Sequence, residues 1–95
     1  DNTEMMLMEV YKSDLIESVK SKVEEFTKHH DCSKYTDILM SIKIRDAESI
    51  TYAQMIELLE EIRNINNSAN VIWGISQDGE LSDDSMRVIL LLSYK

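Results

Sequence analysis

His29, His30 and Cys32 form the densest group of side chains that could bind a transition metal. Imidazole nitrogens and a thiolate are typical zinc ligands, and a structural zinc site holds its ion in a tetrahedron. The three residues follow one another too closely for that geometry, and no second cluster lies at a spacing that would complete it. We therefore interpret this group as a polar helix end and loop, and we expect no metal site.

The acidic residues Asp78, Glu80, Asp83 and Asp84 lie together between two apolar runs and could suggest a calcium loop. An EF-hand loop needs ligands at alternating positions, a central glycine and a bidentate glutamate at about the twelfth position. The order of these acids does not supply that pattern. We interpret the segment as a solvated connection between two strands, and we expect Arg87 to pair with its acids rather than with a substrate.

Patterns typical of catalysis and nucleotide binding do not occur in this sequence. Gly74 and Gly79 are its only glycines, and neither begins a helix directly after a strand, as a phosphate-binding loop requires. Cys32 has no evident activating base, and the Ser, His and Asp residues follow no order that indicates a triad. We expect no catalytic, cofactor-binding or metal-ligating residue and no cofactor bound by this chain.

The length and charge of the chain limit its class and its partners. The 95 residues are 43% hydrophobic and 29% charged, which predicts one globular domain over residues 1–95. The net charge of −8 disfavours nucleic acid and anionic membranes. No apolar run approaches the roughly 20 residues that span a bilayer, and no signal peptide is recognisable. One cysteine fits a reducing compartment, so we expect a soluble, cytoplasmic protein.

Hydrophobic spacing divides the chain into strands and helices. Residues 5–11 are an apolar run whose length suits a strand that is buried on much of both faces. Residues 35–44 alternate between apolar and polar, which indicates a half-buried strand. The remaining elements are expected at these positions: helices at about 13–29 and 51–65, and strands at about 70–77 and 86–94.

Both predicted helices carry an apolar stripe at helical spacing. Ser13 and Asp14, both capping residue types, lie at the start of the first. At the second, Thr51 and Gln54 have the spacing of a capping box. Ile50 and Met55 have the spacing of a hydrophobic staple around it. The expected stripes are Leu15, Val19, Val23 and Phe26 in the first helix, and Met55, Ile56, Leu59, Ile62 and Ile65 in the second.

The order β-α-β-α-β-β, with two right-handed crossovers and a final hairpin, predicts an α+β fold. It is a two-layer sandwich in which both helices cover one face of a four-stranded mixed sheet. In the last strand, Val88, Leu90 and Leu92 are expected to face the helices. The opposite face then presents Leu39, Ile89 and Leu91, beside which Met5 and Leu7 could lie. An apolar patch on an open face usually marks a partner, so Leu39, Ile89 and Leu91 are our candidate docking residues.

Trp73 and Gly74 are adjacent in the predicted strand at 70–77. We interpret the tryptophan as a large core or interface residue rather than a platform for a ligand. We interpret the glycine as the site of a bulge or of a close backbone approach.

The closing segment also carries residue types in a recognisable order. An Ala-Asn pair, two β-branched residues and an aromatic-Gly pair precede an acidic turn with Leu, which is followed by Arg-Val and an apolar strand. The residues are Ala69, Asn70, Val71, Ile72, Trp73, Gly74, Asp78, Leu81, Arg87 and Val88. This pattern resembles the last hairpin of FtsZ, the prokaryotic tubulin homologue, and especially its archaeal forms. Segments 33–42, 50–62 and 14–26 are similar to the elements that precede this hairpin in the family.

The resemblance implies the C-terminal, activation-type subdomain of a tubulin/FtsZ-like cytoskeletal GTPase. In that family the subdomain packs on a long central helix and contributes to the longitudinal contact between protomers. The nucleotide pocket lies on another domain, so GTP is implied only for a full-length member. No residue of this chain maps to that pocket or to the loop that completes hydrolysis.

The sequence departs from the family pattern where the family has glycine or proline. Ile44, Arg45 and Asp46 lie where a Thr-Gly-Gly follows the central strand, and Ser93 and Tyr94 replace a closing Thr-Gly. Residues 27–30 replace a Ser-Pro-Leu-Leu segment. These differences indicate a divergent relative.

Two functions from different classes remain open. The first is a non-catalytic subdomain or standalone relative of a cell-division GTPase that acts through protomer or partner contacts in a filament. The second is a small regulatory module that binds a metabolite or forms a dimer through its sheet face. A small enzyme ranks third because the sequence offers no acid, base or nucleophile cluster. We expect a protein partner or self-association, no nucleic-acid partner and no direct membrane insertion.

Overall fold

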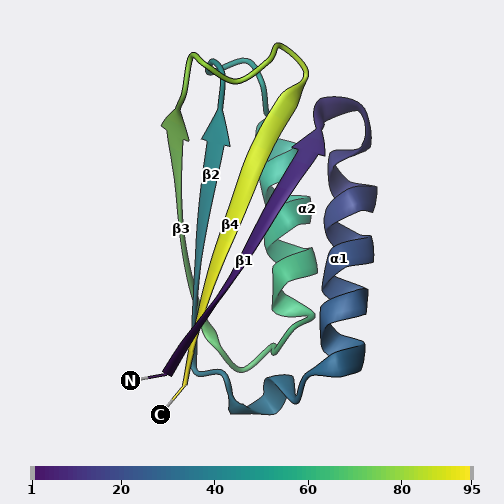
Figure 1. Ribbon diagram of the computed structural model, residues 1–95, viewed down its shortest axis with the longest axis vertical. Helices are drawn as coiled ribbons and strands as arrows, with labels where there is room; N and C mark the ends of the chain where they lie inside the picture. The colour runs from purple at the N-terminus through teal and green to yellow at the C-terminus, as the bar shows by residue number, and fades with distance from the viewer. Residues whose placement is uncertain (1, 95) are drawn as a thin grey trace.

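The computed structural model describes residues 2–94 and contains one four-stranded sheet with two helices packed on one of its faces (Figure 1). The strands are β1 (Asn2–Tyr11), β2 (Asp37–Ile44), β3 (Asn70–Gln77) and β4 (Ser85–Tyr94), and the helices are α1 (Leu15–His29) and α2 (Tyr52–Arg63). The predicted α+β sandwich and the element order β-α-β-α-β-β are confirmed. The predicted final hairpin is wrong, because β4 pairs with β1 and β2 and is not a neighbour of β3.

The strand order in the sheet is β1-β4-β2-β3. β4 lies between β1 and β2 and is antiparallel to both, whereas β3 runs parallel to β2. Helix α1 therefore carries the chain from β1 across β4 to β2, and α2 connects β2 to its neighbour β3. This arrangement makes β1 and β3 the two edges of the sheet.

The core lies between the sheet and the helices and is formed by alternate residues of the strands. Its buried strand residues include Met8 in β1, four residues of β2 (Ile38, Met40, Ile42 and Ile44) and four residues of β4 (Met86, Val88, Leu90 and Leu92). The helix-facing side predicted for Val88, Leu90 and Leu92 is thus confirmed.

Strand β1 differs from its prediction in both length and burial. It begins at Asn2 because its first residues pair with the end of β4, in the register Asn2 to Tyr94. The expectation of burial on both faces is wrong, since Met5 is 68% exposed and Leu7 is 55% exposed. At an edge, with helices on only one side, the second face of β1 has nothing to cover it.

Helix α1 buries the predicted residues Leu15, Val19 and Val23, while Phe26 is partly buried. A short 3-10 turn, Lys12–Asp14, precedes the helix. Asp14 occupies the N-cap position, but its side chain makes no capping hydrogen bond.

Helix α2 begins at the predicted capping box. The backbone N–H of Gln54 donates to Thr51 Oγ1 at 3.1 Å, and the backbone N–H of Thr51 donates to Gln54 Oε1 at 2.9 Å. The predicted stripe is partly wrong, because Leu58 is fully buried while Ile56 is 39% exposed and Leu59 is only half-buried. The helix is therefore rotated so that Met55, Leu58 and Ile62 face the sheet.

Candidate docking surface

The face of the sheet opposite the helices, here named the outer face, carries apolar side chains in rows that follow the strand pairing. Met5 pairs with Leu91, Leu91 pairs with Leu39, and Leu39 pairs with Ile72. Residues paired across strands lie on the same face. One apolar row therefore crosses all four strands.

A second row lies next to this one and is apolar over half its length. Leu7 pairs with Ile89, whose other neighbour, Ser41, pairs with Gly74. We name the apolar members of the two rows the apolar band, which consists of Met5, Leu7, Leu39, Ile72, Ile89 and Leu91. At the β2 and β3 end of the second row, Ser41 and Gly74 add no large side chain to the surface.

The predicted docking residues Leu39, Ile89 and Leu91 all lie in the apolar band, and Met5 and Leu7 lie beside them. Ile72, which is 67% exposed, was missing from the prediction. Strand alternation already put Ile72 on the face opposite Trp73, but its place beside Leu39 depends on the register between β2 and β3.

Polar rows border the apolar band on both sides. Beyond the Leu7 row, Glu9 pairs with Arg87, and Arg87 pairs with Lys43. The Glu9 carboxylate accepts a hydrogen bond from Arg87 Nε at 3.2 Å. Beyond the Met5 row, Thr3, Ser93, Asp37 and Asn70 lie in register. An apolar centre with a polar rim is the composition of a protein interface.

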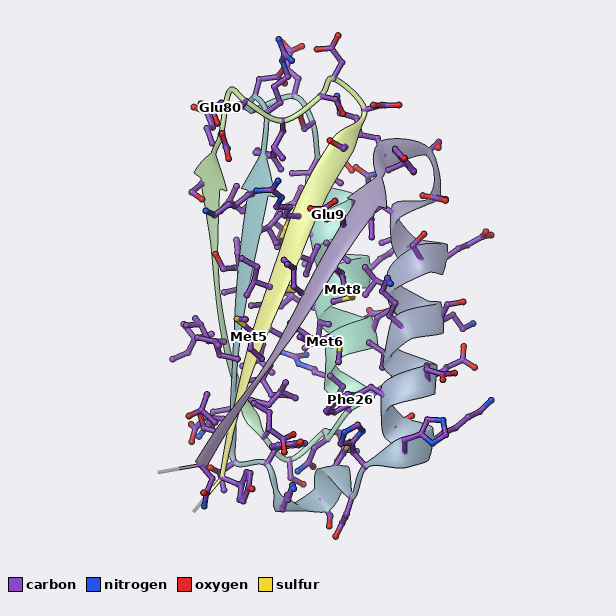
Figure 2. All side chains as sticks on the ribbon, in the orientation of Figure 1. Met5, Met6, Met8, Glu9, Phe26 and Glu80 are labelled. Carbon is purple, nitrogen blue, oxygen red and sulfur yellow. The ribbon has the colours of Figure 1, made fainter. Side chains whose placement is uncertain are left out.

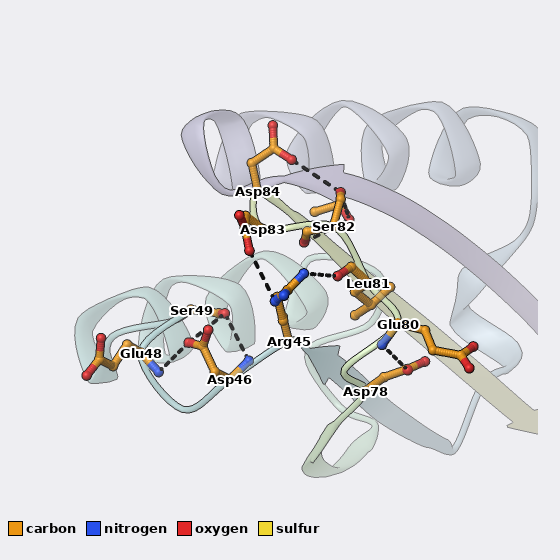
Figure 3. Close-up of polar contacts among 11 residues, drawn as sticks. Arg45, Asp46, Glu48, Ser49, Asp78, Glu80, Leu81, Ser82, Asp83 and Asp84 are labelled. Carbon is orange, nitrogen blue, oxygen red and sulfur yellow. Dashed lines mark hydrogen bonds and ion pairs between the residues drawn. The ribbon is translucent and has the colours of Figure 1, made fainter.

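Arg87 does not pair with the acidic loop, so that prediction is wrong. Its strand register aims it at Glu9 on β1, and Arg45 contacts the loop instead (Figure 3). Arg45 Nε lies 3.1 Å from an Asp83 carboxylate oxygen, and its guanidinium donates to the Leu81 carbonyl at 2.9 Å. Leu81 is buried beneath this contact.

Two acids of the loop, Asp78 and Asp84, accept hydrogen bonds from other residues of the loop. Asp78 accepts from the Glu80 backbone N–H at 3.0 Å, and Asp84 accepts from the Ser82 hydroxyl at 3.2 Å (Figure 3). These are turn-stabilising hydrogen bonds. Within residues 2–94, no group of three or more His, Cys, Asp and Glu is placed to hold a metal ion.

The side chains of His29, His30 and Cys32 have separate local partners. His29 Nε2 lies 3.4 Å from Glu25, while His30 stacks on Phe26 at a ring-centroid distance of 4.1 Å. The Cys32 thiol is buried and donates to the His30 carbonyl at 3.6 Å. Burial raises the pKa of this thiol, which disfavours the thiolate needed for nucleophilic attack.

Glu4, at the start of β1, contacts both Tyr35 and Lys34. The Tyr35 hydroxyl donates to the Glu4 carboxylate, and Lys34 Nζ lies 3.7 Å from it. The Tyr35 hydrogen bond is the main reason that the pKa of Glu4 is lowered, and the Lys34 charge adds to it. Burial, followed by the Glu4 carboxylate, raises the pKa of Tyr35.

A groove of about 550 Å³ runs between β1 and α1 and opens to solvent. Met6, Met8 and Phe26 supply apolar walls, and Figure 2 shows these side chains between the strand and the helix. Lys22 and Glu25 lie at its polar margin. Its volume lies within the range of small-molecule sites.

Gly74 differs from its prediction, and Trp73 is not a core residue. Trp73 lies on the helix side of β3 but is 45% exposed, because the helices lie behind the other strands and leave β3 uncovered (Figure 1). The pairing of β2 with β3 is continuous through Gly74, and no atom lies within 4 Å of the position a Cβ would take there. Gly74 therefore marks neither a bulge nor a close approach.

No helix in the described part of the chain is long and apolar enough to cross a membrane.

Comparisons with known proteins identify the fold. No protein-family model matches the chain, and no curated protein matches it. Solved structures with a similar fold include an empty FtsZ dimer from M. jannaschii, with a TM-score of 0.67, 20% identity and 95% of this chain covered. A point mutant of FtsZ from M. jannaschii has a TM-score of 0.68 at 18% identity and covers 96% of this chain.

A third similar structure is CetZ2 from Haloferax volcanii, solved as a GTPγS-bound protofilament. It has a TM-score of 0.64 and 15% identity, with 95% of this chain covered. The chain spans only 26% to 28% of the length of these three structures. The fold is therefore similar to that of a segment of FtsZ and CetZ.

Proposed function

We propose that this chain is the C-terminal subdomain, or a divergent standalone relative of that subdomain, of an archaeal-type FtsZ/tubulin-like protein, and that it works by contact rather than by catalysis. The similarity of its fold to FtsZ and CetZ supports the kinship. In a full-length protein, GTP would be bound by a separate domain, and the protein would act in a cytoplasmic cell-division filament.

The apolar band on the outer face is the observation that carries the proposal. Leu39 is 42% exposed there, and Met5, Leu7 and Ile72 are more than half exposed. Monomeric proteins seldom leave a contiguous apolar surface of this kind in water. The band would be covered in the intact assembly, either by another part of the same protein or by a neighbouring protomer.

Thiol labelling measures this coverage directly. In a Cys32→Ser background, Leu39→Cys introduces a single thiol in the middle of the apolar band. We expect it to react with a maleimide on the order of tenfold more slowly in the intact gene product, assembled with GTP, than in the isolated chain, because thiol reactivity follows exposure.

Ile56→Cys in the same background is the matched control. Ile56 is 39% exposed, close to the 42% of Leu39, but it lies on α2 and away from the outer face. Its labelling should be equally fast in both samples. If the thiol at position 39 also stays fully reactive in the assembly, the outer face is not a contact surface and the proposal fails.

A metabolite-binding module is the second candidate, and the groove between β1 and α1 favours it. A ligand that binds only the folded chain raises its melting temperature by mass action. Saturable stabilisation by a member of a metabolite panel, lost in Phe26→Ala but kept in Leu39→Ala, would assign the ligand to the groove. A panel without any such shift would remove this candidate.

A further inference from the structure

The outer edge of the sheet at β3 presents unpaired backbone groups. The backbone N–H of Asn70 donates to the Thr36 carbonyl at 2.9 Å, and that of Asp78 donates to the Ile44 carbonyl at 2.7 Å. Hydrogen-bonding direction alternates along a strand, so the even-numbered residues of β3 bond to β2. The N–H and C=O groups of the odd-numbered residues, from Val71 to Ile75, therefore point away from the sheet.

Nothing in the sequence of β3 protects this edge. Natural proteins blunt edge strands with charges, prolines or bulges. The segment NVIWGISQ contains no charged residue and no proline, and its register with β2 is continuous. The other edge strand, β1, carries Glu4 and Glu9. In a chain with a net charge of −8, an uncharged edge of eight residues is a local exception.

The side chains of the same odd-numbered residues form an apolar strip on the helix side. Trp73 is 45% exposed and Ile75 is 41% exposed, because neither helix lies behind β3 (Figure 1). The edge is therefore sterically open, and free backbone groups and exposed apolar side chains lie along one line.

We propose that β3 pairs antiparallel with β3 of a second copy of this chain, about a two-fold axis at Trp73, to form a continuous eight-stranded sheet. Two residues that exchange backbone hydrogen bonds in an antiparallel ladder must both direct their N–H and C=O groups toward the other strand. Trp73 opposite Trp73 of the second copy, and Val71 opposite Ile75 of the second copy, satisfy that condition. Every odd-numbered apolar residue of β3 then faces another one.

The sequence of β3 is self-complementary in this register, which favours a second copy over an unrelated strand. On the outer face, the bulky Ile72 lies opposite Gly74 of the second copy, where no atom competes for the space. A shift by two residues in one direction would place Val71 against the polar Gln77, and a shift in the other would place Ile75 against Ala69, which lies outside β3. A two-fold axis requires such a self-matching patch.

This edge contact is separate from the outer-face contact of the proposed function, so each can fail alone. Pairing through β3 leaves the apolar band of both copies exposed. It also sets the two bands side by side, because the row that ends at Ile72 continues into the row that begins at Gly74 of the second copy.

Sedimentation equilibrium of the purified chain, combined with Trp emission over a dilution series, tests the proposal. Trp73 is the only tryptophan, so its fluorescence emission reports the solvent exposure of the side chain at the two-fold axis. We expect the mass to approach that of a dimer as concentration rises, with the emission shifting to shorter wavelength over the same range. Ile75→Lys should weaken the dimer by more than about tenfold. Leu39→Lys, at matched exposure on the outer face, should leave it unchanged.

Disulfide trapping reports the register. The pair of Ile72 and Gly74 of the second copy is not hydrogen-bonded, and the Cα separation of about 4.5 Å in such pairs suits a disulfide. In the Cys32→Ser background, Ile72→Cys with Gly74→Cys should give a covalent dimer on oxidation, and Gly74→Cys alone should not. A monomer at every concentration, or a dimer lost in Leu39→Lys and kept in Ile75→Lys, would overturn the proposal.

Discussion

The contact of Glu4 with Tyr35 and Lys34 shows how a few side chains join elements that are far apart in the sequence. Tyr35 is almost fully buried, yet its hydroxyl reaches a carboxylate at the start of β1. Lys34 also lies over the ring of Tyr94, at 4.3 Å from the centroid. The start of β1, the residues just before β2 and the end of β4 are therefore held together at one corner of the sheet.

This contact predicts a pH dependence of stability. The folded-state pKa of Glu4 is below its ordinary value of 4.5, so its contribution is fully present above pH 4.5 and is lost as the pH falls through the lowered pKa. Tyr35→Phe removes the hydroxyl and keeps the buried ring. We expect the pKa of Glu4 to rise, and acidification to destabilise the variant less than the wild type.

The measurement is an NMR titration of the Glu4 carboxyl, together with urea unfolding at several pH values. Tyr11→Phe removes a hydroxyl from an exposed residue of the same strand and should leave the Glu4 titration unchanged. A Glu4 pKa that stays low in Tyr35→Phe would assign the shift to Lys34 instead.

At the scale of elements, the rotation of α2 decides which of two adjacent leucines belongs to the core. The sequence pattern favours Leu59, but Leu58 is the residue with no exposed surface. Leu58 lies with Met55 and Ile62 on the buried face of α2, whereas Ile56 is exposed and Leu59 is only half-buried.

Paired substitutions measure this rotation. Leu58→Ala should lower the free energy of unfolding by about 2 to 5 kcal/mol, since it leaves a cavity in the core. Leu59→Ala, with the same change in helix propensity, should cost about 1 kcal/mol because the side chain is already half in water. Urea denaturation of both variants is the test, and equal losses would contradict the observed rotation.

For the molecule as a whole, the net negative charge destabilises the folded state by repulsion between like charges. The described ion pairs, such as Arg45 with Asp83 and Arg87 with Glu9, have exposed partners and contribute little. The net charge of −8 leaves repulsion that these pairs do not offset.

We therefore expect NaCl to stabilise the chain. Raising the salt from about 0.01 M to about 0.2 M shortens the screening length enough to weaken repulsion across the molecule. The melting temperature at pH 7 should rise, and the rise should disappear near the isoelectric point of about 4.6. A melting temperature that falls with salt at pH 7 would mean that attractive pairs dominate.

The strands and the two faces of the sheet follow from alternation, which is local, and the capping box of α2 follows from two residue types at fixed spacing. Strand pairing joins residues that are far apart in the sequence. The sequence pattern therefore does not predict that Arg87 contacts Glu9 or that Ile72 lies beside Leu39. The exposure of Met5 and Leu7 could not be predicted either. Residues 5–8 are all apolar, so no alternation distinguishes the two faces of the strand.

The position of β4 between β1 and β2 has a consequence for synthesis. A ribosome makes β1 first, yet the only strand that pairs with it is the last of the four to emerge. Until then, Met5 to Met8 have no sheet to join and remain available to chaperones or to other nascent chains. Pairing β1 with β4 closes a loop that contains all the intervening elements. This makes folding slow compared with that of a local hairpin. The interval between the first and the fourth strand is thus the period of greatest aggregation risk.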